Sequence, residues 1–442
     1  MPSRRALLRS GAVAAAAGLA GCSALADDDS VPLPDATPGP DDWPTDGYDQ
    51  RNSRYNVGAS PPASEPTPRW SREFLFCHDP VVRGTRVVLN TGTENREYTV
   101  GLRATDGETV WRSESEPWGY PTPTLGAKRA YVTGPDCAFG VDLATGAETW
   151  RGDPCEGANT ASGTVADGRL YLEYGGYFSA LDATGKRRWA TSHEARANPA
   201  VVGDTAYVAT AFAVAALDLT ATAREWPWQD PDGDTPAHAD RQAARTWQEP
   251  PDSSLVGPRY YHSPAVSDSL VFATATNRDD RAGGALRVLD RSTGEERWSV
   301  ASPPDRAPGE ERREAPDPVS EPVPPVVTDD LVITGLGDRQ VLALDHGGDI
   351  QWTRSLDHSV TELAGAGDTV LAVTHDRDIE RTGAGHGGVV ALGLESGSRR
   401  WSLGFDDHVS GLVAAGGSVY ATVVADRQAD GDVVRERLVA LS

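Results

Sequence analysis

Residues 139–151 read FGVDLATGAETWR, a short apolar run followed by Asp142, a turn that contains Gly146, and Trp150. The same order returns in LRVLDRSTGEERWS at 286–299 and in VLALDHGGDIQWT at 341–353. A unit written several times in one chain is expected to stack its copies into one repeating architecture, and this observation overrides any domain count based on length. We therefore interpret the 442 residues as one repeat domain with additional N-terminal segments.

Tryptophan marks the period of the repeat. The first intervals are about 40 residues, which is typical of four-stranded propeller blades. Later intervals are longer, and they predict insertions at 227–262, between two blades, and at 301–324. The eight marks are Trp70, Trp111, Trp150, Trp189, Trp226, Trp298, Trp352 and Trp401.

The sequence of each unit predicts four short strands, with a tight turn before the fourth strand. Gly stands four residues before Trp150, where a hairpin turn needs a positive φ, and Asp142 can accept hydrogen bonds from the turn's N–H groups. A sheet that is buried on both faces between neighbouring blades needs large flat side chains to fill a space that widens outward. The tryptophans are therefore expected to be structural, one for each blade.

The two ends of the repeat region predict ring closure. The chain ends in RLVALS at 437–442, a strand with no Gly turn or Trp after it, whereas the strand around Trp70 has no partner before it. Pairing these two segments removes two exposed edges. The expected fold is all-β: an eight-bladed propeller of four-stranded blades over residues 66–442, closed by its N-terminal and C-terminal strands.

The motif resembles the pyrroloquinoline-quinone (PQQ) repeat. The stretches that carry it best are Thr145-Gly146 to Trp150, Thr184-Gly185 to Trp189 and Thr293-Gly294 to Trp298. The resemblance implies a PQQ-like propeller. The enzymes of this family bind PQQ with Ca²⁺ over the propeller axis, commonly beside a pair of adjacent cysteines, and no such pair occurs here. We therefore expect no cofactor and no catalytic residues; a PQQ- and calcium-dependent quinoprotein oxidoreductase is the alternative.

The charge balance is strongly acidic. The chain has 41 Lys plus Arg against 65 Asp plus Glu, a formal net charge of −24, and its lysines are Lys128 and Lys186. A surface of this sign repels phosphates, so neither a nucleic acid nor an anionic membrane surface is expected as a partner of the body of the protein. The composition resembles that of proteins from extremely halophilic archaea; a GC-rich genome, which favours Arg over Lys, is the alternative.

The N-terminus predicts export and a lipid anchor. Residues 3–22, SRRALLRSGAVAAAAGLAGC, place two arginines before an Ala-rich stretch that is too short and too weakly apolar to span a bilayer. This resembles a twin-arginine signal with a lipobox, which implies removal of residues 1–21 and lipidation of Cys22 at the outer face of the cell membrane. A signal cleaved without lipidation, or left uncleaved, is the alternative. Residues 22–42 are expected to form a disordered tether.

Three more cysteines follow. If CAFGVDL at 137–143 pairs with ETWRGDPC at 148–155, Cys137 lies near Cys155, and a disulfide is plausible in an exported protein. A register slip of one residue would separate the two. Cys77 is then left over, either as a buried small apolar residue or as a reactive or metal-binding thiol.

Several histidines precede inner strands and are expected near the propeller axis. Imidazoles that converge there could bind a transition metal, with solvated loop histidines as the alternative. The candidate metal ligands are His78, His262, His358 and His408.

Residues 43–56, WPTDGYDQRNSRYN, resemble the segment before the first repeat of related propellers, which implies that residues 43–65 dock on the ring through Trp43, Tyr48 and Tyr55. Ligand binding by these rings is the alternative. The chain as a whole is interpreted as a lipid-anchored, non-catalytic protein-binding or scaffolding module at the cell surface, with other surface or membrane proteins as partners. In Gram-negative bacteria a similar lipoprotein propeller helps to insert outer-membrane proteins. A metal-binding surface protein is the further alternative.

Overall fold

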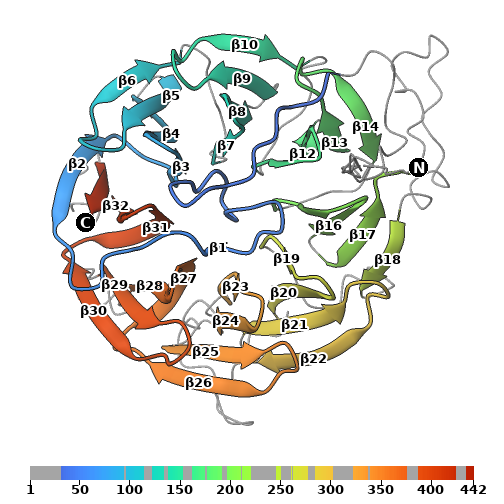
Figure 1. Cartoon of the computed structure of the whole chain (residues 1–442), viewed down its shortest axis with the longest axis vertical. Coiled ribbons are helices and arrows are strands. Elements are labelled where there is room, and N and C mark those ends of the chain that lie inside the picture. Colours follow the sequence, from blue (N-terminus) through green and yellow to red (C-terminus); the bar gives the residue numbers. More distant parts are fainter. Residues whose placement is uncertain are drawn as a thin grey trace, which may run out of the picture.

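The computed structural model shows a ring of eight sheets around a central axis (Figure 1). It describes residues 31–442 except 94–95, 114–121, 134–137, 153–161, 175–176, 192–196, 211, 221–244, 250–259, 261, 277–283, 302–321, 337–338, 376–386 and 425–434. Within these described ranges no helix is long and apolar enough to cross a membrane. The fold is the expected eight-bladed propeller.

Each blade has four antiparallel strands, of which the first lies nearest the axis, and blade 7 gains a fifth, parallel strand from the N-terminal segment. Blades 1 to 4 consist of β3 (Val81–Arg83), β4 (Arg86–Thr93), β5 (Arg96–Arg103) and β6 (Thr109–Arg112); β7 (Thr124–Leu125), β8 (Arg129–Thr133), β9 (Ala138–Asp142) and β10 (Glu148–Arg151); β11 (Thr164–Ala166), β12 (Arg169–Tyr174), β13 (Tyr177–Leu181) and β14 (Arg187–Thr191); and β15 (Ala200–Val202), β16 (Thr205–Ala209), β17 (Val214–Asp218) and β18 (Arg245–Glu249).

Blades 5 to 8 follow the same plan, with additions from the N-terminus. They consist of β19 (Ala265–Val266), β20 (Leu270–Thr276), β21 (Gly284–Asp290) and β22 (Glu296–Ala301); β23 (Val326–Val327), β24 (Leu331–Gly335), β25 (Gln340–Asp345) and β26 (Ile350–Ser355); β27 (Ser359–Ala366), β28 (Thr369–His375), β29 (Gly387–Gly393) and β30 (Arg399–Phe405), with β1 (Tyr55–Asn56) added; and β31 (His408–Ala415), β32 (Ser418–Val424), β33 (Glu436–Leu441) and β2 (Pro68–Phe74).

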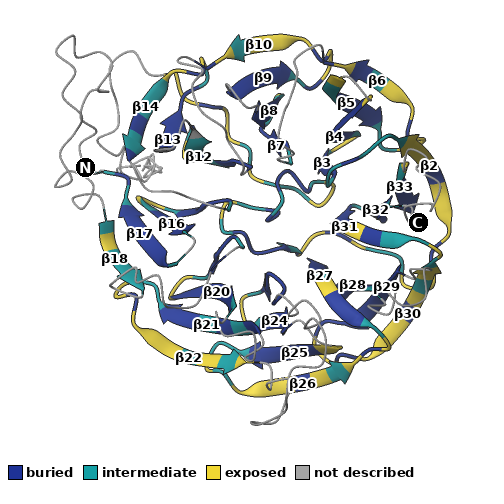
Figure 2. Ribbon diagram, turned by 180° about the vertical axis from the view of Figure 1, so that it is seen from behind, coloured by how far each residue is buried: buried dark blue, intermediate teal, exposed yellow. Residues whose placement is uncertain are grey.

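The hydrophobic core lies between neighbouring blades. Val81 and Val88 of blade 1 share one cluster with Leu125 and Phe139 of blade 2. Inner and middle strands are buried on both faces and read as continuous apolar runs, whereas outer strands such as β10, β22 and β26 are largely exposed (Figure 2). Burial between sheets is therefore the main source of stability.

The N-terminal and C-terminal strands close the ring, as the sequence predicted. Strand β2 pairs antiparallel with β33, from Pro68 opposite Leu441 to Phe74 opposite Glu436. Blade 8 is thus built from both ends of the repeat region, and neither end leaves an unpaired strand edge.

The outer-strand tryptophans join each blade to the next. The ring of Trp111 lies against Gly146 in the following blade, and its indole N–H donates to the carbonyl of Leu143 at 2.8 Å. The same indole bond occurs at several other junctions: Trp70 to Ala104, Trp247 to Arg291, Trp298 to His346, Trp352 to Leu394 and Trp401 to Pro62. Pro62 precedes β2 and so provides, at the closing junction, the acceptor that a blade turn provides elsewhere.

Blade 4 corrects two predictions. Its outer strand is β18, and Trp247 faces Ala216 there as Trp189 faces Ala180 in blade 3. Trp226 lies outside the described residues and is not the tryptophan of this strand. The predicted insertion at 227–262 between blades is therefore wrong, because the extra residues lie inside blade 4, between β17 and β18. A long connection there costs little, since the two strands still pair with each other in the usual register.

Candidate functional site: a plugged axis

An N-terminal segment closes one end of the axis. Each blade's innermost strand has an inward edge whose N–H groups need partners. Residues 40–60, here called the plug, supply them, and Figure 1 shows this dark blue segment crossing the centre of the ring. The backbone bonds from blade N–H to plug carbonyl are Val82 to Trp43, Leu125 to Pro44, Val201 to Gln50, Val266 to Arg51, Val327 to Ser53 and Gly365 to Arg54, at 2.6–2.9 Å.

The remaining two blades also bind the plug. The hydroxyl of Thr45 donates to the carbonyl of Gly163, just before β11, at 3.3 Å. In blade 8 the N–H of Gly416 donates to the carbonyl of Pro40 at 2.8 Å. All eight blades are thus connected through one short piece of chain, which restrains them relative to one another.

The plug lies at the face formed by the tight turns. Because strands alternate in direction, turns between first and second strands lie at the same face as turns between third and fourth strands. Among the former, the turns at Gly84, Gly367 and Gly416 bind plug residues. We call this end the plug face. The opposite end is the loop face, where β22, β28 and β32 end and the strands that follow them, β23, β29 and β33, begin.

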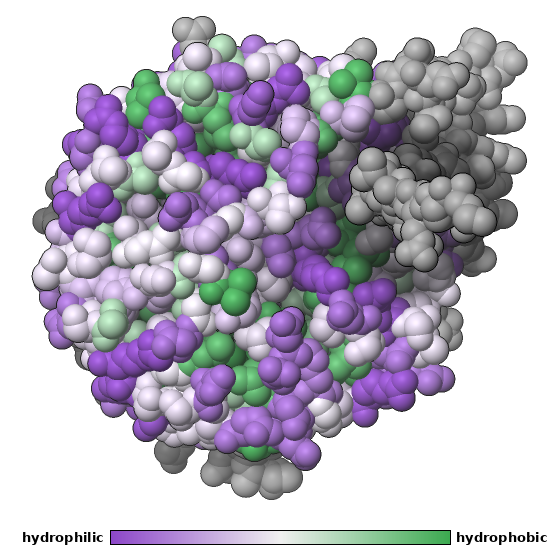
Figure 3. Space-filling view, in the orientation of Figure 1, coloured by the Kyte–Doolittle hydropathy of each residue, from purple (hydrophilic) through white to green (hydrophobic). Residues whose placement is uncertain are grey.

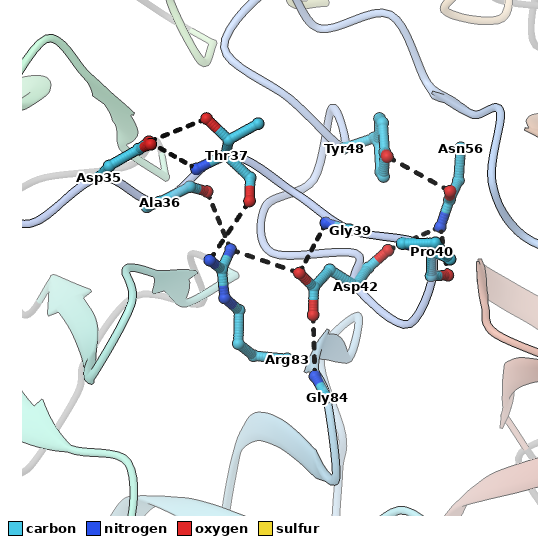
Figure 4. A network of polar contacts seen from close by, with 10 residues as sticks. All are labelled: Asp35, Ala36, Thr37, Gly39, Pro40, Asp42, Tyr48, Asn56, Arg83 and Gly84. Atoms are coloured by element: carbon cyan, nitrogen blue, oxygen red, sulfur yellow. Dashed lines mark hydrogen bonds and ion pairs between the residues drawn. The ribbon is translucent and has the colours of Figure 1, made fainter.

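Residues 31–39 form a strap across the plug face. The carbonyl of Val31 accepts from Ala183, and the N–H of Leu33 donates to Gly168, both at 2.8 Å in blade 3. At the other end Arg83 of blade 1 donates to the carbonyl of Ala36 at 2.9 Å (Figure 4). A cavity of about 680 Å³ lies between strap, plug and blades 2 and 3. The prediction of a disordered tether is therefore wrong for residues 31–42, because the blade turns bind their backbone.

Buried polar side chains fix the path of the plug. Asn56 is fully buried, and its amide donates to the carbonyls of Pro40 and Asp42 at 2.9 Å while its oxygen accepts from the Tyr48 hydroxyl at 3.3 Å (Figure 4). Trp43 is completely buried and packs on Tyr48, with ring centroids 5.2 Å apart. These rings lie in the core of the docked segment.

The plug also holds three of the residues other than glycine that adopt a positive φ in the described structure. They are Tyr48, Asn52 and Arg54, with φ of 74°, 53° and 49°. Such backbone costs of order 1 kcal/mol or more for each residue and persists only where surrounding contacts enforce it. The bonds to all eight blades are the contacts that enforce it here.

Charged side chains gather on the loop-face side of the plug, in what we call the axial cluster: Asp46, Arg54, Asp79 and Glu362. The Arg54 guanidinium bonds Asp46 at 2.8 Å and Glu362 at 3.4 Å, and its side chain is only 8 % exposed. Asp79 precedes β3, Glu362 lies in β27, and both interact electrostatically with Arg54. Three carboxylates therefore surround one guanidinium.

Burial and mutual repulsion make this cluster bind protons. Burial, together with the nearby Asp46, raises the pKa of Asp79 to about 7. Burial and the charge of Asp79 raise the pKa of Glu362 well above its ordinary value, although Arg54 opposes the shift. His262 lies close enough for burial and the Arg54 charge to lower its pKa to about 4, so its imidazole is neutral at pH 7.

Cys77 lies beside the cluster as a buried residue. Its backbone N–H donates to a carboxylate oxygen of Glu436 at 2.6 Å, and its side chain contacts Thr422. Burial and the Glu436 charge raise the pKa of the thiol, which keeps it protonated at neutral pH. Of the two interpretations, the geometry favours the small buried residue over a reactive thiol.

The four candidate metal-binding histidines are not brought together. His408 packs its ring on His375, with centroids 4.2 Å apart, and His78 packs on Phe76. In the part of the chain that the structure describes, no group of three or more His, Cys, Asp or Glu side chains could hold a metal ion. One metal site built from His78, His262, His358 and His408 is therefore not supported.

Three predicted site residues fall outside the described residues: Cys22 of the lipobox, Cys137 and Cys155. The lipid anchor and the disulfide remain predictions.

A quinone cofactor does not fit the residues that the structure describes at the axis. Calcium that is bound beside such a cofactor needs several oxygen ligands free to coordinate it. At the axis, Asp46 and Glu362 already bind Arg54, and the plug fills the end below them. The axial cluster instead ties plug residues to blades 1 and 7.

Sequence reasoning found the plug but missed Arg54 and Glu362. These residues are more than 300 positions apart in the chain, and neither belongs to a motif. The one available signal was Asp79, which follows a histidine and precedes a proline at the start of an inner strand.

A family model described as outer membrane protein assembly factor BamB matches residues 95–227 and 240–437. No curated protein matches the chain.

Several solved structures share the fold at low identity. Quinohemoprotein alcohol dehydrogenase from Comamonas testosteroni is 14 % identical over 91 % of this chain and 80 % of its own, with a TM-score of 0.62. A europium-containing methanol dehydrogenase is 12 % identical over 91 % of this chain and 98 % of its own, with a TM-score of 0.56. The computationally designed Ika8 protein is 13 % identical over 86 % of this chain and 98 % of its own, with a TM-score of 0.52. Enzymes and a designed protein thus share this architecture, which by itself assigns no activity.

Proposed function

From the premise that this chain belongs to the PQQ-like propeller family described as outer membrane protein assembly factor BamB, we propose that it is a non-catalytic scaffold that binds other proteins at the cell surface. In this proposal it is exported by the twin-arginine route, anchored through a lipid on Cys22, and binds surface or membrane proteins with its loop face.

The difference between the two faces is the observation that carries the proposal. On the plug face, the strands within a blade are joined by tight turns such as those at Gly84, Gly203 and Gly416, all with positive φ, and the exception is the connection 219–244 between β17 and β18 in blade 4. On the loop face, connections such as 302–325 and 425–435 are much longer. Long connections held by a rigid scaffold are where proteins place binding residues.

The closed ring suits a scaffold. The plug bonds all eight blades, and β2 with β33 seals blade 8. The buried charges at the axis are used to hold the plug, with Arg54 bonded to Asp46 and Glu362. The arrangement favours a fixed platform over a ring that opens to admit a substrate.

Site-specific photocrosslinking tests this proposal. Benzoylphenylalanine placed at Arg96, Asp357 or Asp406, which are exposed on the loop face, should form covalent adducts with a protein in membranes kept at high salt. The same probe at Asp268 or Glu395, exposed on the plug face, is the matched control and should form none. Adducts only from the plug face, or none from either face, would contradict the assignment.

Two further measurements address the other parts of the proposal. Cys22→Ser should move the protein from the membrane fraction to the soluble fraction, and an unchanged distribution would reject the lipid anchor. Addition of PQQ with Ca²⁺ should produce no cofactor absorbance and no oxidation of alcohols or sugars. Turnover in that assay would replace the scaffold with the oxidoreductase.

A further inference from the structure

The strap fixes where the anchored chain leaves the folded protein. Val31 and Leu33 are bonded to Ala183 and Gly168, which belong to the two plug-face turns of blade 3. Val31 lies nine positions after Cys22. A chain of nine such steps spans about 30 Å when fully extended and typically about 17 Å as a flexible coil.

The height of the ring sets the distance that a tether would have to cover to reach the loop face. Strand β31 has eight residues, so the two faces of blade 8 are about 27 Å apart at about 3.4 Å per residue. A tether that leaves the plug face near the rim would use nearly all of its extended length to bring the loop face to a membrane. The same tether brings the plug face to a membrane without being fully extended.

The exposed apolar side chains independently mark the same face. Over the described part of the chain, the exposed large hydrophobic side chains are Val31, Val57 and Ile350, at 47 %, 70 % and 56 %. Val31 is held at a turn of blade 3, Val57 follows β1 beside the turn at Gly367, and Ile350 directly follows the turn before β26. All three positions belong to the plug face.

We propose that the plug face lies against a lipid surface, with Val31, Val57 and Ile350 touching the bilayer interface and the loop face pointing away. This orientation rests on the proposed anchor at Cys22. Individual aliphatic contacts of this kind are weak, so the tether supplies the attachment and the side chains supply the orientation.

Charge places a condition on this contact. Exposed carboxylates such as Asp268, Asp329 and Glu395 also lie at the plug face, and Figure 3, in the orientation of Figure 1, shows many hydrophilic residues on the surface around a few hydrophobic ones. The carboxylates repel anionic lipids at low ionic strength. At about 1 M salt the Debye length falls to about 3 Å, so the repulsion is screened while the aliphatic contact persists. We therefore expect the contact to strengthen with salt.

Fluorescence quenching on vesicles tests the orientation without depending on biological lipidation. A chain of residues 22–442 with a hexahistidine tag before residue 22 is attached to vesicles of phosphatidylcholine, phosphatidylglycerol and a nickel-chelating lipid. An environment-sensitive fluorophore is introduced as a noncanonical residue at Val57 or Ile350, or at Asp406 on the loop face as the matched control. Spin-labelled lipids serve as quenchers.

The expected result is several-fold stronger quenching at Val57 and Ile350 than at Asp406, increasing from 0.1 M to about 1 M KCl as screening increases. Equal quenching at the three positions, or quenching confined to Asp406, would overturn the orientation, and so would capture of a protein by the plug face. Failure of the native chain to partition into membranes would reject the Cys22 anchor, whereas absence of quenching on these vesicles rejects the orientation alone.

Discussion

Replacement of Trp111 by Ala removes the indole that joins blade 1 to blade 2. The side chain is 6 % exposed, so the change uncovers about 200 Å² of aromatic surface, which at about 25 cal/mol per Å² corresponds to about 5 kcal/mol, an upper value because the unfolded chain hides part of this area. It also leaves the buried carbonyl of Leu143 without its 2.8 Å partner, at about 1 kcal/mol. We expect the free energy of unfolding to fall by about 3–5 kcal/mol.

Denaturant unfolding followed by far-ultraviolet circular dichroism measures this change, because the signal from strands does not depend on the removed indole. Trp111→Phe is the control that keeps much of the apolar area and loses the N–H donor, so its cost should be clearly smaller.

A second pair of variants separates the contact with the indole ring from backbone strain in the turn. Gly146→Ala places a Cβ 2.8 Å from the Trp111 ring at φ 76°, whereas Gly203→Ala has φ 57° and open space around it.

A cost of less than about 1 kcal/mol for Trp111→Ala, the size of an ordinary surface change, would contradict a packing role for this indole. Equal losses for Trp111→Phe and Trp111→Ala would do so too, since the filled space between blades would then be irrelevant. Equal effects of Gly146→Ala and Gly203→Ala would show that the indole does not press on the turn.

The axial cluster supplies the remaining predictions. Arg54→Ala leaves two partly buried carboxylates, 29 % and 15 % exposed, without their partner and should lower the unfolding free energy by about 2–4 kcal/mol. Arg51→Ala breaks an ion pair whose partner carboxylate is 92 % exposed and should cost below about 1 kcal/mol; similar midpoints for the two would refute the cluster's role. Because the folded pKa of Asp79 is about 7 against an ordinary 3.8, the folded state binds the proton more tightly, and stability should fall as pH rises from 4 to 7. Asp79→Asn should flatten that slope and stabilise the protein at pH 8; an unchanged slope in a pH series of melting curves would count against the shift. A Cβ at Gly411 would overlap an oxygen of Asp79, so Gly411→Ala should destabilise by about 1–3 kcal/mol, and less in the Asp79→Ala background; additive losses would show that the two residues do not touch.

The fold was predictable because its determinants are local and repeated. Asp142, Gly146 and Trp150 belong to one hairpin. Asp142 and Gly146 shape its turn, and Trp150 lies in the outer strand that follows. Ring closure was predictable because an unpaired first strand and an unpaired last strand are complementary.

Blade 4 shows where local reasoning fails. Trp226 continued the interval of the preceding tryptophans, yet Trp247 occupies the outer strand, opposite Ala216. An insertion within a hairpin leaves the pairing register intact while it moves the tryptophan along the chain, so spacing alone cannot separate the two candidates. Trp247 lacks the Gly four residues earlier that precedes Trp111, Trp150 and Trp298, and Trp226 lacks it as well.

The axial cluster could not be predicted from the sequence for a different reason. Arg54, Asp79 and Glu362 meet only because the plug passes beneath blades 1 and 7. No period or motif relates them, and their perturbed protonation follows from burial that exists only after the ring is closed.

Blade 8 joins Pro68–Phe74 to Glu436–Leu441, so a ribosome must release nearly the whole chain before the last sheet can form. The pairing has very high contact order, which makes closure a late and slow event in folding. A chain that stops before β33 would keep β2 without a partner and present a bare strand edge to chaperones, proteases and other nascent chains. Synthesis through β33 is therefore a condition for a sealed ring.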